Sequence, residues 1–277
     1  MATTHEVPTI DAVREADQAH DEAVTEPSNS DDGSKRRLRD INHTWPLTWG
    51  DGAKFLAVYA VMCGVWIGMG MAITHGLQHS WLQRTDEHIE VWLSQHRTHT
   101  LNTLTFIGSQ LADTMVKIAA TALIALGMLF AWRRWKEPLF VVAALILEAS
   151  VFITTTWTVG RPRPDVPRLE TSPVGSSFPS GHVAAAVVYS AIAVVVFWHT
   201  RKRWARVLAV CVVTFIVLAA GFSRMYRGMH HLSDVIAGIL LGLVAVFATY
   251  VIVQHASNRH GEAVSYTHLT LPTILRV

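Results

Sequence analysis

The sequence predicts an all-α integral membrane protein with six transmembrane helices and an interfacial helix between the first and the second. Of the 277 residues, 51% are hydrophobic and only 16% are charged, whereas soluble domains carry about 25% charged residues. The apolar residues also gather in six segments with more polar flanks. A helix needs about 20 residues to cross the hydrocarbon core of a bilayer, which is close to the length of each segment.

The composition divides the chain into three regions. Residues 1–51 are polar and acidic and include a basic cluster at Lys35–Arg39, so we expect a disordered cytoplasmic tail that buries too little apolar surface to fold. Residues 52–258 contain all six apolar segments and form one membrane domain. We expect the tail 259–277 to be partly non-native, because Val264–Val277 resembles translated sequencing-adaptor read-through.

The first predicted transmembrane helix, Phe55–Thr74, has twenty residues without a charge and can span by itself. After it, Leu77–Asn102 mixes large apolar residues with charges, which is typical of a helix lying in the membrane interface. The other five spans are shorter or contain a polar residue, but each is much more apolar than its flanks. They run over Asp113–Trp132, Leu139–Val159, His182–Trp198, Val207–Phe222 and Val235–Val253.

Basic residues indicate which side of the membrane each connection faces. They cluster at Lys35–Arg39, at 133–136 and at 201–206. With six spans and a cytoplasmic N-terminus, all three clusters fall on the cytoplasmic side, as the positive-inside rule requires. The connections after the third and the fifth span are therefore predicted to face outward.

Three polar motifs lie in these outward connections. They are Gly160-Arg161-Pro162-Arg163-Pro164-Asp165, Phe178-Pro179-Ser180-Gly181-His182 and the stretch Ser223–Asp234. Arginine presents a planar fork of donors that matches phosphate oxygens, so Arg161, Arg163 and Arg224 predict an oxyanion site. Ser180 and Gly181 precede a predicted helix, whose free N–H groups also favour an anion.

Two histidines in these motifs can perform chemistry on a bound phosphate. His182 and His230 are suited to act as an acid and a nucleophile. Asp234 lies one helical turn after His230, where it can accept a hydrogen bond from one ring nitrogen and leave the other free to attack. No residues have metal-ligand spacing, so neither a metal nor another cofactor is expected.

Glu148 is a further charged residue, in the middle of the third span. A carboxylate at this depth is costly, which makes it a functional candidate by default. It lies about 20 Å deeper than Arg161 at 1.5 Å per residue, so a packing role is preferred over chemistry on the phosphate.

The motifs resemble those of the type 2 phosphatidic acid phosphatase (PAP2) superfamily, which carries K-x6-R-P, P-S-G-H and S-R-x5-H-x3-D in this order. The second and third are matched in full, and the resemblance covers about residues 52–254. The first departs: Arg163-Pro164 match it, but Thr156 stands at the lysine position. Arg161 is the favoured substitute for that cation, and Lys117 of the second span is the less favoured one.

The resemblance implies that His230 becomes a phosphohistidine, that Asp234 orients it, and that His182 protonates the leaving oxygen and then activates water. The implied phosphate-binding residues are Arg161, Arg163, Ser180, Gly181 and Arg224. The implied reaction is metal-independent hydrolysis of a lipid phosphate or a polyprenyl diphosphate on the outer face of a bacterial plasma membrane, with no nucleic-acid partner. The alternative is a non-enzymatic lipid-binding or transport protein on a degenerate scaffold, to which Thr156 lends limited support.

Overall fold

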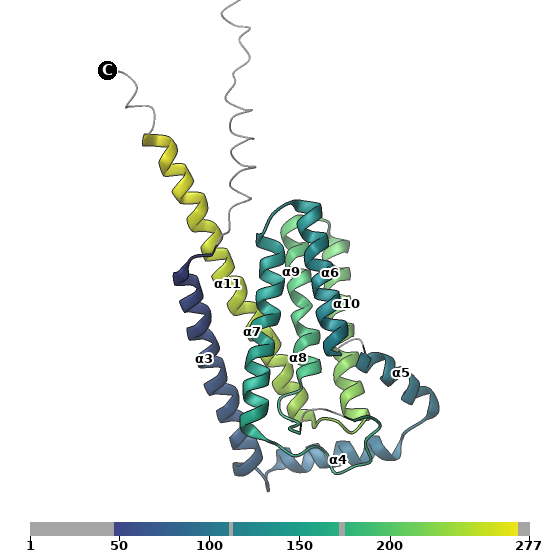
Figure 1. The fold of residues 1–277 in the computed structure, drawn as a ribbon. Helices are drawn as coiled ribbons and strands as arrows, with labels where there is room; N and C mark the ends of the chain where they lie inside the picture. Colours follow the sequence, from purple (N-terminus) through teal and green to yellow (C-terminus); the bar gives the residue numbers. More distant parts are fainter. Residues whose placement is uncertain (1–46, 111–112, 172–174, 271–277) are drawn as a thin grey trace, which may run out of the picture. The chain divides into compact units, whose positions relative to one another are not determined.

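The structure, a computed structural model, describes residues 47–110, 113–171 and 175–270 (Figure 1). The predicted tail up to residue 46, with the Lys35–Arg39 cluster, lies outside the described residues, as do residues 271–277.

Six segments of the described residues are long and apolar enough to cross a membrane, in agreement with the predicted fold class. Each contains most of one predicted span, and five of the six extend beyond the predicted bounds, by at most six residues at either end. The helices are α3 (Trp49–Met71) with the π-helical turn η1 (Ala72–Gly76), α6 (Thr114–Trp132), α7 (Lys136–Val159), α8 (Gly181–Val188) with α9 (Ser190–His199), α10 (Arg203–Tyr226) and α11 (Leu232–Thr270).

The first span begins earlier than predicted because Thr48 and Asp51 form a capping box. The Thr48 N–H donates to the Asp51 carboxylate at 3.0 Å, and so does the Thr48 hydroxyl at 2.9 Å. Such a cap satisfies backbone donors that a helix start otherwise leaves unpaired. The same carboxylate pairs with Arg259 of α11, so the first and last spans are joined at this end.

The opposite end of the bundle, where α7 and α10 end and α8 and α11 begin, is called the motif end here. The segment before α6 forms two helices in place of the single one predicted: α4 (Trp81–Gln95) and α5 (His99–Gln110). Figure 1 shows α4 lying across the motif end. It contacts α10 and α11, while α5 packs on α10. The amphipathic α4 therefore covers the polar loops at this end of the bundle.

The close packing of α11 on α8 depends on two glycines one turn apart. A Cβ on Gly238 would lie 2.5 Å from the carbonyl oxygen of Ser180, and one on Gly242 would lie 2.6 Å from that of Ala184. Small residues at this spacing let two transmembrane helices approach closely. The approach brings the start of α8, which carries the second motif, against the start of α11, which carries the third.

Candidate active site

Backbone hydrogen bonds hold the three motifs together at the motif end. The Ser177 N–H donates to the Arg161 carbonyl at 2.8 Å, and the Ser180 N–H donates to the Asp234 carbonyl at 3.0 Å. Arg163 Nη1 donates to the Met229 carbonyl at 2.6 Å. These bonds link residues that are far apart in the sequence, so the loops form one polar cluster.

The tautomer of His230 is set by a backbone carbonyl. Its Nδ1 lies 2.7 Å from the carbonyl oxygen of Ser177, which can only accept, so Nδ1 carries the proton. The nearest carboxylate oxygen of Asp234 lies 3.8 Å from Nδ1, beyond hydrogen-bond distance. The expected orienting bond to Asp234 is thus replaced by one to Ser177, and Nε2 keeps its lone pair.

His230 is buried, and its environment favours the neutral ring. Burial lowers the pKa of His230 from 6.5 to about 3; the Asp234 carboxylate opposes this, and the charges of Arg224 and Arg163 add to it. A neutral imidazole is the form that can attack an electrophile. Near neutral pH, His230 therefore has the protonation state of a nucleophile.

Asp234 is engaged by groups other than His230. One carboxylate oxygen accepts from Arg161 Nη1 at 2.5 Å, and the other accepts the N–H of His231 at 2.9 Å. Its charge still lies beside the His230 ring. Asp234 therefore fixes the start of α11 and contributes an electrostatic field to His230.

Arg161 lies in a buried ion-pair network at the edge of the polar pocket that α4 and the first motif enclose. Its guanidinium donates to Asp234, to the Ser233 hydroxyl at 2.7 Å and to Asp86 of α4 at 3.1 Å. Asp86 also accepts the Ser233 N–H at 3.0 Å. Two carboxylates already neutralise this arginine, so we withdraw the predicted phosphate contact for Arg161 and assign it to positioning of the third motif.

A second acidic residue of α4, Glu90, holds His231. Its carboxylate forms a hydrogen bond with His231 Nδ1, while Nε2 donates to the Pro162 carbonyl at 3.1 Å. Burial alone would lower the pKa of His231, but the hydrogen bond to Glu90 and the charge of Asp234 outweigh it and raise the pKa. With both ring nitrogens facing acceptors, the protonated ring is the favoured form.

The hydrogen-bonded pair of Glu90 and His231 predicts that the stability of the fold depends on pH. Because the pKa of His231 is higher in the fold than its ordinary 6.5, its contribution is complete below about pH 6.5 and is lost as the pH rises through the folded pKa. We expect the unfolding temperature in detergent to fall over that range. Glu90→Gln should flatten this fall, whereas Glu87→Gln, at an exposed position of α4, should not. An unchanged slope in Glu90→Gln would contradict the assignment.

Of the remaining predicted anion ligands, Ser180, Gly181 and Arg224 are buried and Arg163 is half-buried. Ser180 and Arg224 are 0% and 3% exposed, and the Ser180 hydroxyl and Arg224 Nε have no hydrogen-bond partner among the described residues. Gly181 is the first residue of α8. Arg163 donates to two carbonyls, and burial lowers its pKa from the ordinary 12.5. These groups can donate hydrogen bonds to the oxygens of a tetrahedral oxyanion.

Arg224 has a carboxylate neighbour that was not expected. Glu170, in the loop between the first two motifs, pairs with Arg224 and, at 2.8 Å, with Arg227. Arg224 Nη1 also donates to Ser109 of α5 at 2.7 Å. The Glu170 carboxylate therefore balances the charge of two buried arginines while leaving Arg224 Nε without a partner.

His182 is the second residue of α8 and is partly exposed. It interacts electrostatically with Arg163 of the first motif and with Lys117 of α6. No hydrogen bond fixes either ring nitrogen among the described residues. Both nitrogens can therefore exchange a proton with a group bound beside them.

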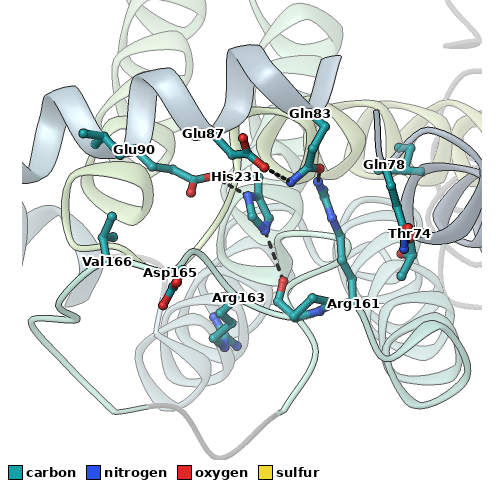
Figure 2. Close-up of a pocket in the computed structure, with 13 residues that line it drawn as sticks. Thr74, Gln78, Gln83, Glu87, Glu90, Arg161, Arg163, Asp165, Val166 and His231 are labelled. Atoms are coloured by element: carbon teal, nitrogen blue, oxygen red, sulfur yellow. Dashed lines mark hydrogen bonds and ion pairs between the residues drawn. The ribbon is translucent and has the colours of Figure 1, made fainter. Parts of the chain in front are cut away.

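A polar pocket of about 610 Å³ lies between α4 and the loop that carries the first motif (Figure 2). Arg163, Asp165 and His231 form one side, and Gln83, Glu87 and Glu90 of α4 form the other. Figure 2 shows the His231 ring directed at Glu90. Since Arg163 lines this pocket and also acts electrostatically on His230, the pocket adjoins the candidate site.

Sequence reasoning missed the acidic residues that support the site. Asp86 and Glu90 lie four residues apart, so they share one face of α4. That spacing can be read from the sequence, but an amphipathic pattern predicts that charged residues face solvent. The side chains of Asp86 and Glu90 are instead only 1% and 5% exposed. Glu170 and the Ser177 carbonyl carried no sequence signal at all.

The comparisons with known proteins agree with this arrangement. The model of the PAP2 superfamily matches residues 137–257, which include all three motifs. Residues 137–257 of this chain therefore match the PAP2 superfamily, and the described residues form an all-helical fold with six helices long and apolar enough to cross a membrane.

Phosphatidylglycerophosphatase B of Bacillus subtilis is 32% identical over 132 residues, which are 45% of this chain and 62% of that protein. The bacitracin transport permease protein BcrC of Bacillus licheniformis is 26% identical over 138 residues, 46% of this chain and 63% of that protein. Both matches span less than two thirds of the curated relative.

A crystal structure of a transmembrane PAP2-type phosphatidylglycerolphosphate phosphatase from Bacillus subtilis superposes with a TM-score of 0.59. It covers 73% of this chain and 95% of that one at 23% identity, and it shows the shared fold.

Proposed function

We propose that this protein is a phosphatase that hydrolyses the phosphoester or diphosphate bond of a membrane lipid through a phosphohistidine at His230. The observation that carries the proposal is a buried, neutral histidine with a free Nε2 beside unpaired oxyanion donors. Arginine forks and a serine hydroxyl suit the three equatorial oxygens of a phosphoryl group in transfer. The similarity to a phosphatidylglycerophosphatase supports the same reaction class.

In the first step, the lone pair of His230 Nε2 forms a bond to phosphorus, and the bond from phosphorus to the lipid oxygen breaks. Protonated His182 gives its proton to that leaving oxygen, which departs as an alcohol from a phosphomonoester and as a lipid monophosphate from a diphosphate. Arg163, Arg224 and the Ser180 hydroxyl stabilise the charge on the other oxygens. The Gly181 N–H at the start of α8 adds a donor of the same kind.

In the second step, neutral His182 takes a proton from water, and the water oxygen bonds to phosphorus while the nitrogen–phosphorus bond breaks. The electron pair returns to His230, and inorganic phosphate leaves. The phosphorylated ring of His230 is cationic as long as Ser177 holds the Nδ1 proton. The nearby Asp234 carboxylate stabilises that positive charge, a role that its 3.8 Å separation permits.

A lipid substrate is supported by an apolar groove of about 500 Å³ between α6, α9 and α10. Its lining includes Val116 and Ile124 of α6, Ile192 of α9, and Leu208 and Val212 of α10. These helices belong to the predicted spans, so the groove lies at bilayer depth. The lining runs from Trp204, near the start of α10, to Val116, near the start of α6, so a hydrocarbon chain that enters the groove from the motif end would have its phosphate near the start of α6.

The proposed location follows from charge. The connections around Arg133, Lys136 and Arg203 lie at the end opposite the motifs. The positive-inside rule assigns that end, together with the N-terminus, to the cytoplasm. The site would then face outward from a bacterial plasma membrane.

A phosphate-release assay on the purified protein tests the function. The substrate panel contains a diacylglycerol phosphate, a phosphatidylglycerophosphate and a polyprenyl diphosphate, each with and without EDTA. We expect release from at least one lipid, unchanged by the chelator and inhibited by vanadate. Folded protein that releases phosphate from none of them would favour the non-enzymatic lipid-binding or transport alternative, and activity that needs a divalent ion would contradict the metal-independent step.

A further inference from the structure

The start of α6 carries a lysine directed into the bundle. Lys117 is 7% exposed and shares a buried stripe with Thr121, Ala125 and Met128 at helical spacing, whereas Met115 and Leu123 point outward. A lysine on the lipid-facing side would extend toward the headgroups. Lys117 instead faces α7, on which α6 packs.

Lys117 lies at the depth of the site. It is three residues after Thr114, the first residue of α6, which places it about 4.5 Å from that end. His182 is the second residue of α8, which begins at the same end of the bundle. The two side chains interact electrostatically.

The charge of Lys117 is poorly compensated. Its ammonium forms no hydrogen bond or ion pair among the described residues. Its electrostatic partners include Glu148 of α7, which is fully buried and whose two carboxylate oxygens also have no hydrogen-bond partner. Glu148 lies about 16 Å below the end of α7, well below the level of the motifs. A buried cation without a contacting anion is costly in a membrane span.

We propose that Lys117 is a further phosphate ligand that contacts the phosphoryl oxygens of the substrate from α6. Val116, the residue before it, lines the apolar groove, so a lipid chain that enters the groove from the motif end would have its phosphate near the start of α6. Thr156 cannot take this role, because its hydroxyl donates to the Phe178 carbonyl at 3.3 Å. Arg161 is held by Asp86 and Asp234. The proposal rests on the proposed function and adds a cation to its site.

Vanadate binding measured by calorimetry on the detergent-purified protein tests the contact without requiring turnover. Lys117→Met should weaken binding about tenfold to a hundredfold, because a hydrogen bond to a charged group contributes about 1.5–3 kcal/mol. The matched control is Lys136→Met, at the opposite end of the bundle beside Trp198, and it should bind vanadate as the wild type does. Where a lipid is hydrolysed, Lys117→Met should also raise KM.

The alternative is that Lys117 only serves as the counterion of Glu148, and this role predicts a different result for vanadate binding. Removing the lysine leaves a buried carboxylate alone, so the single variant can lose stability. The double variant Lys117→Met, Glu148→Gln removes both charges. We expect it to fold and still bind vanadate weakly, whereas recovery of wild-type binding would overturn the proposal.

The remaining outcomes separate this proposal from the enzymatic function. Vanadate binding that depends on Lys117, in a protein that hydrolyses no lipid phosphate, would uphold the contact and refute the phosphatase. Hydrolysis and vanadate binding that are both unchanged in Lys117→Met would refute the contact alone. A wild-type protein that binds no vanadate would overturn the contact as well.

Discussion

His230→Ala is expected to lower kcat by at least about 10³-fold while the protein stays folded and inserted. The buried imidazole is the group whose Nε2 is free to form the covalent intermediate, and its Nδ1 proton is committed to the Ser177 carbonyl. Alanine removes the nucleophile but leaves Arg163, Arg224 and Ser180 in place. Substrate binding should therefore be weakened less than turnover, so the change should appear in kcat more than in KM.

The matched control for this experiment is His88→Ala, at an exposed position of α4. It removes an imidazole from the same end of the bundle and should keep wild-type kinetics. Thermal unfolding in detergent checks that both variants are folded. If His230→Ala retained activity within tenfold of the wild type, another group would be the nucleophile.

His182→Ala is expected to change the kinetics in a way that depends on the leaving group. A general acid or base contributes about 10²–10⁴-fold, and His182 has both roles in turn. On a lipid phosphomonoester, whose alkoxide is a poor leaving group, both steps should be slow. On p-nitrophenyl phosphate, the leaving group departs without a proton, so formation of the phosphoenzyme should largely recover while its hydrolysis stays slow.

The expected signature is a burst of nitrophenol followed by a slow steady state. Labelled phosphate should remain on the protein in an acid-labile, base-stable bond, as a phosphohistidine requires. Adding His230→Ala to the same chain should abolish the label. No burst and no bound label at saturating substrate would mean that the two histidines have other roles or that water attacks the substrate directly.

The contacts of Asp234 affect how a loss of activity in an Asp234 variant should be interpreted. Asp234 holds Arg161 and the start of α11 and lies 3.8 Å from the His230 ring. An Asp234 variant would therefore disturb the Arg161–Asp86 network together with the nucleophile. Loss of activity in such a variant is weaker evidence for an acid–base role than the His182 and His230 experiments.

The sequence by itself determined the membrane class, the six spans and the family. Uninterrupted apolar runs have few alternatives to a spanning helix, because the bilayer requires every backbone polar group to be paired within the segment. The motifs that contain His182, His230 and Asp234 were also recognisable, because the residues of each motif lie close together in the sequence. The fold and the superfamily predicted from these features are confirmed.

Only the tertiary structure decided which partner each polar side chain has. Arg161 was expected at the phosphate but is neutralised by Asp86 and Asp234, and Ser177 takes the orienting role expected of Asp234. Lys117 was the less favoured cation, and it is buried without a contacting carboxylate among the described residues, whereas Arg161 is paired with two. The physical reason is that burial and pairing of charges depend on which helix faces cross, and here α4 closes over the motif end from another part of the chain.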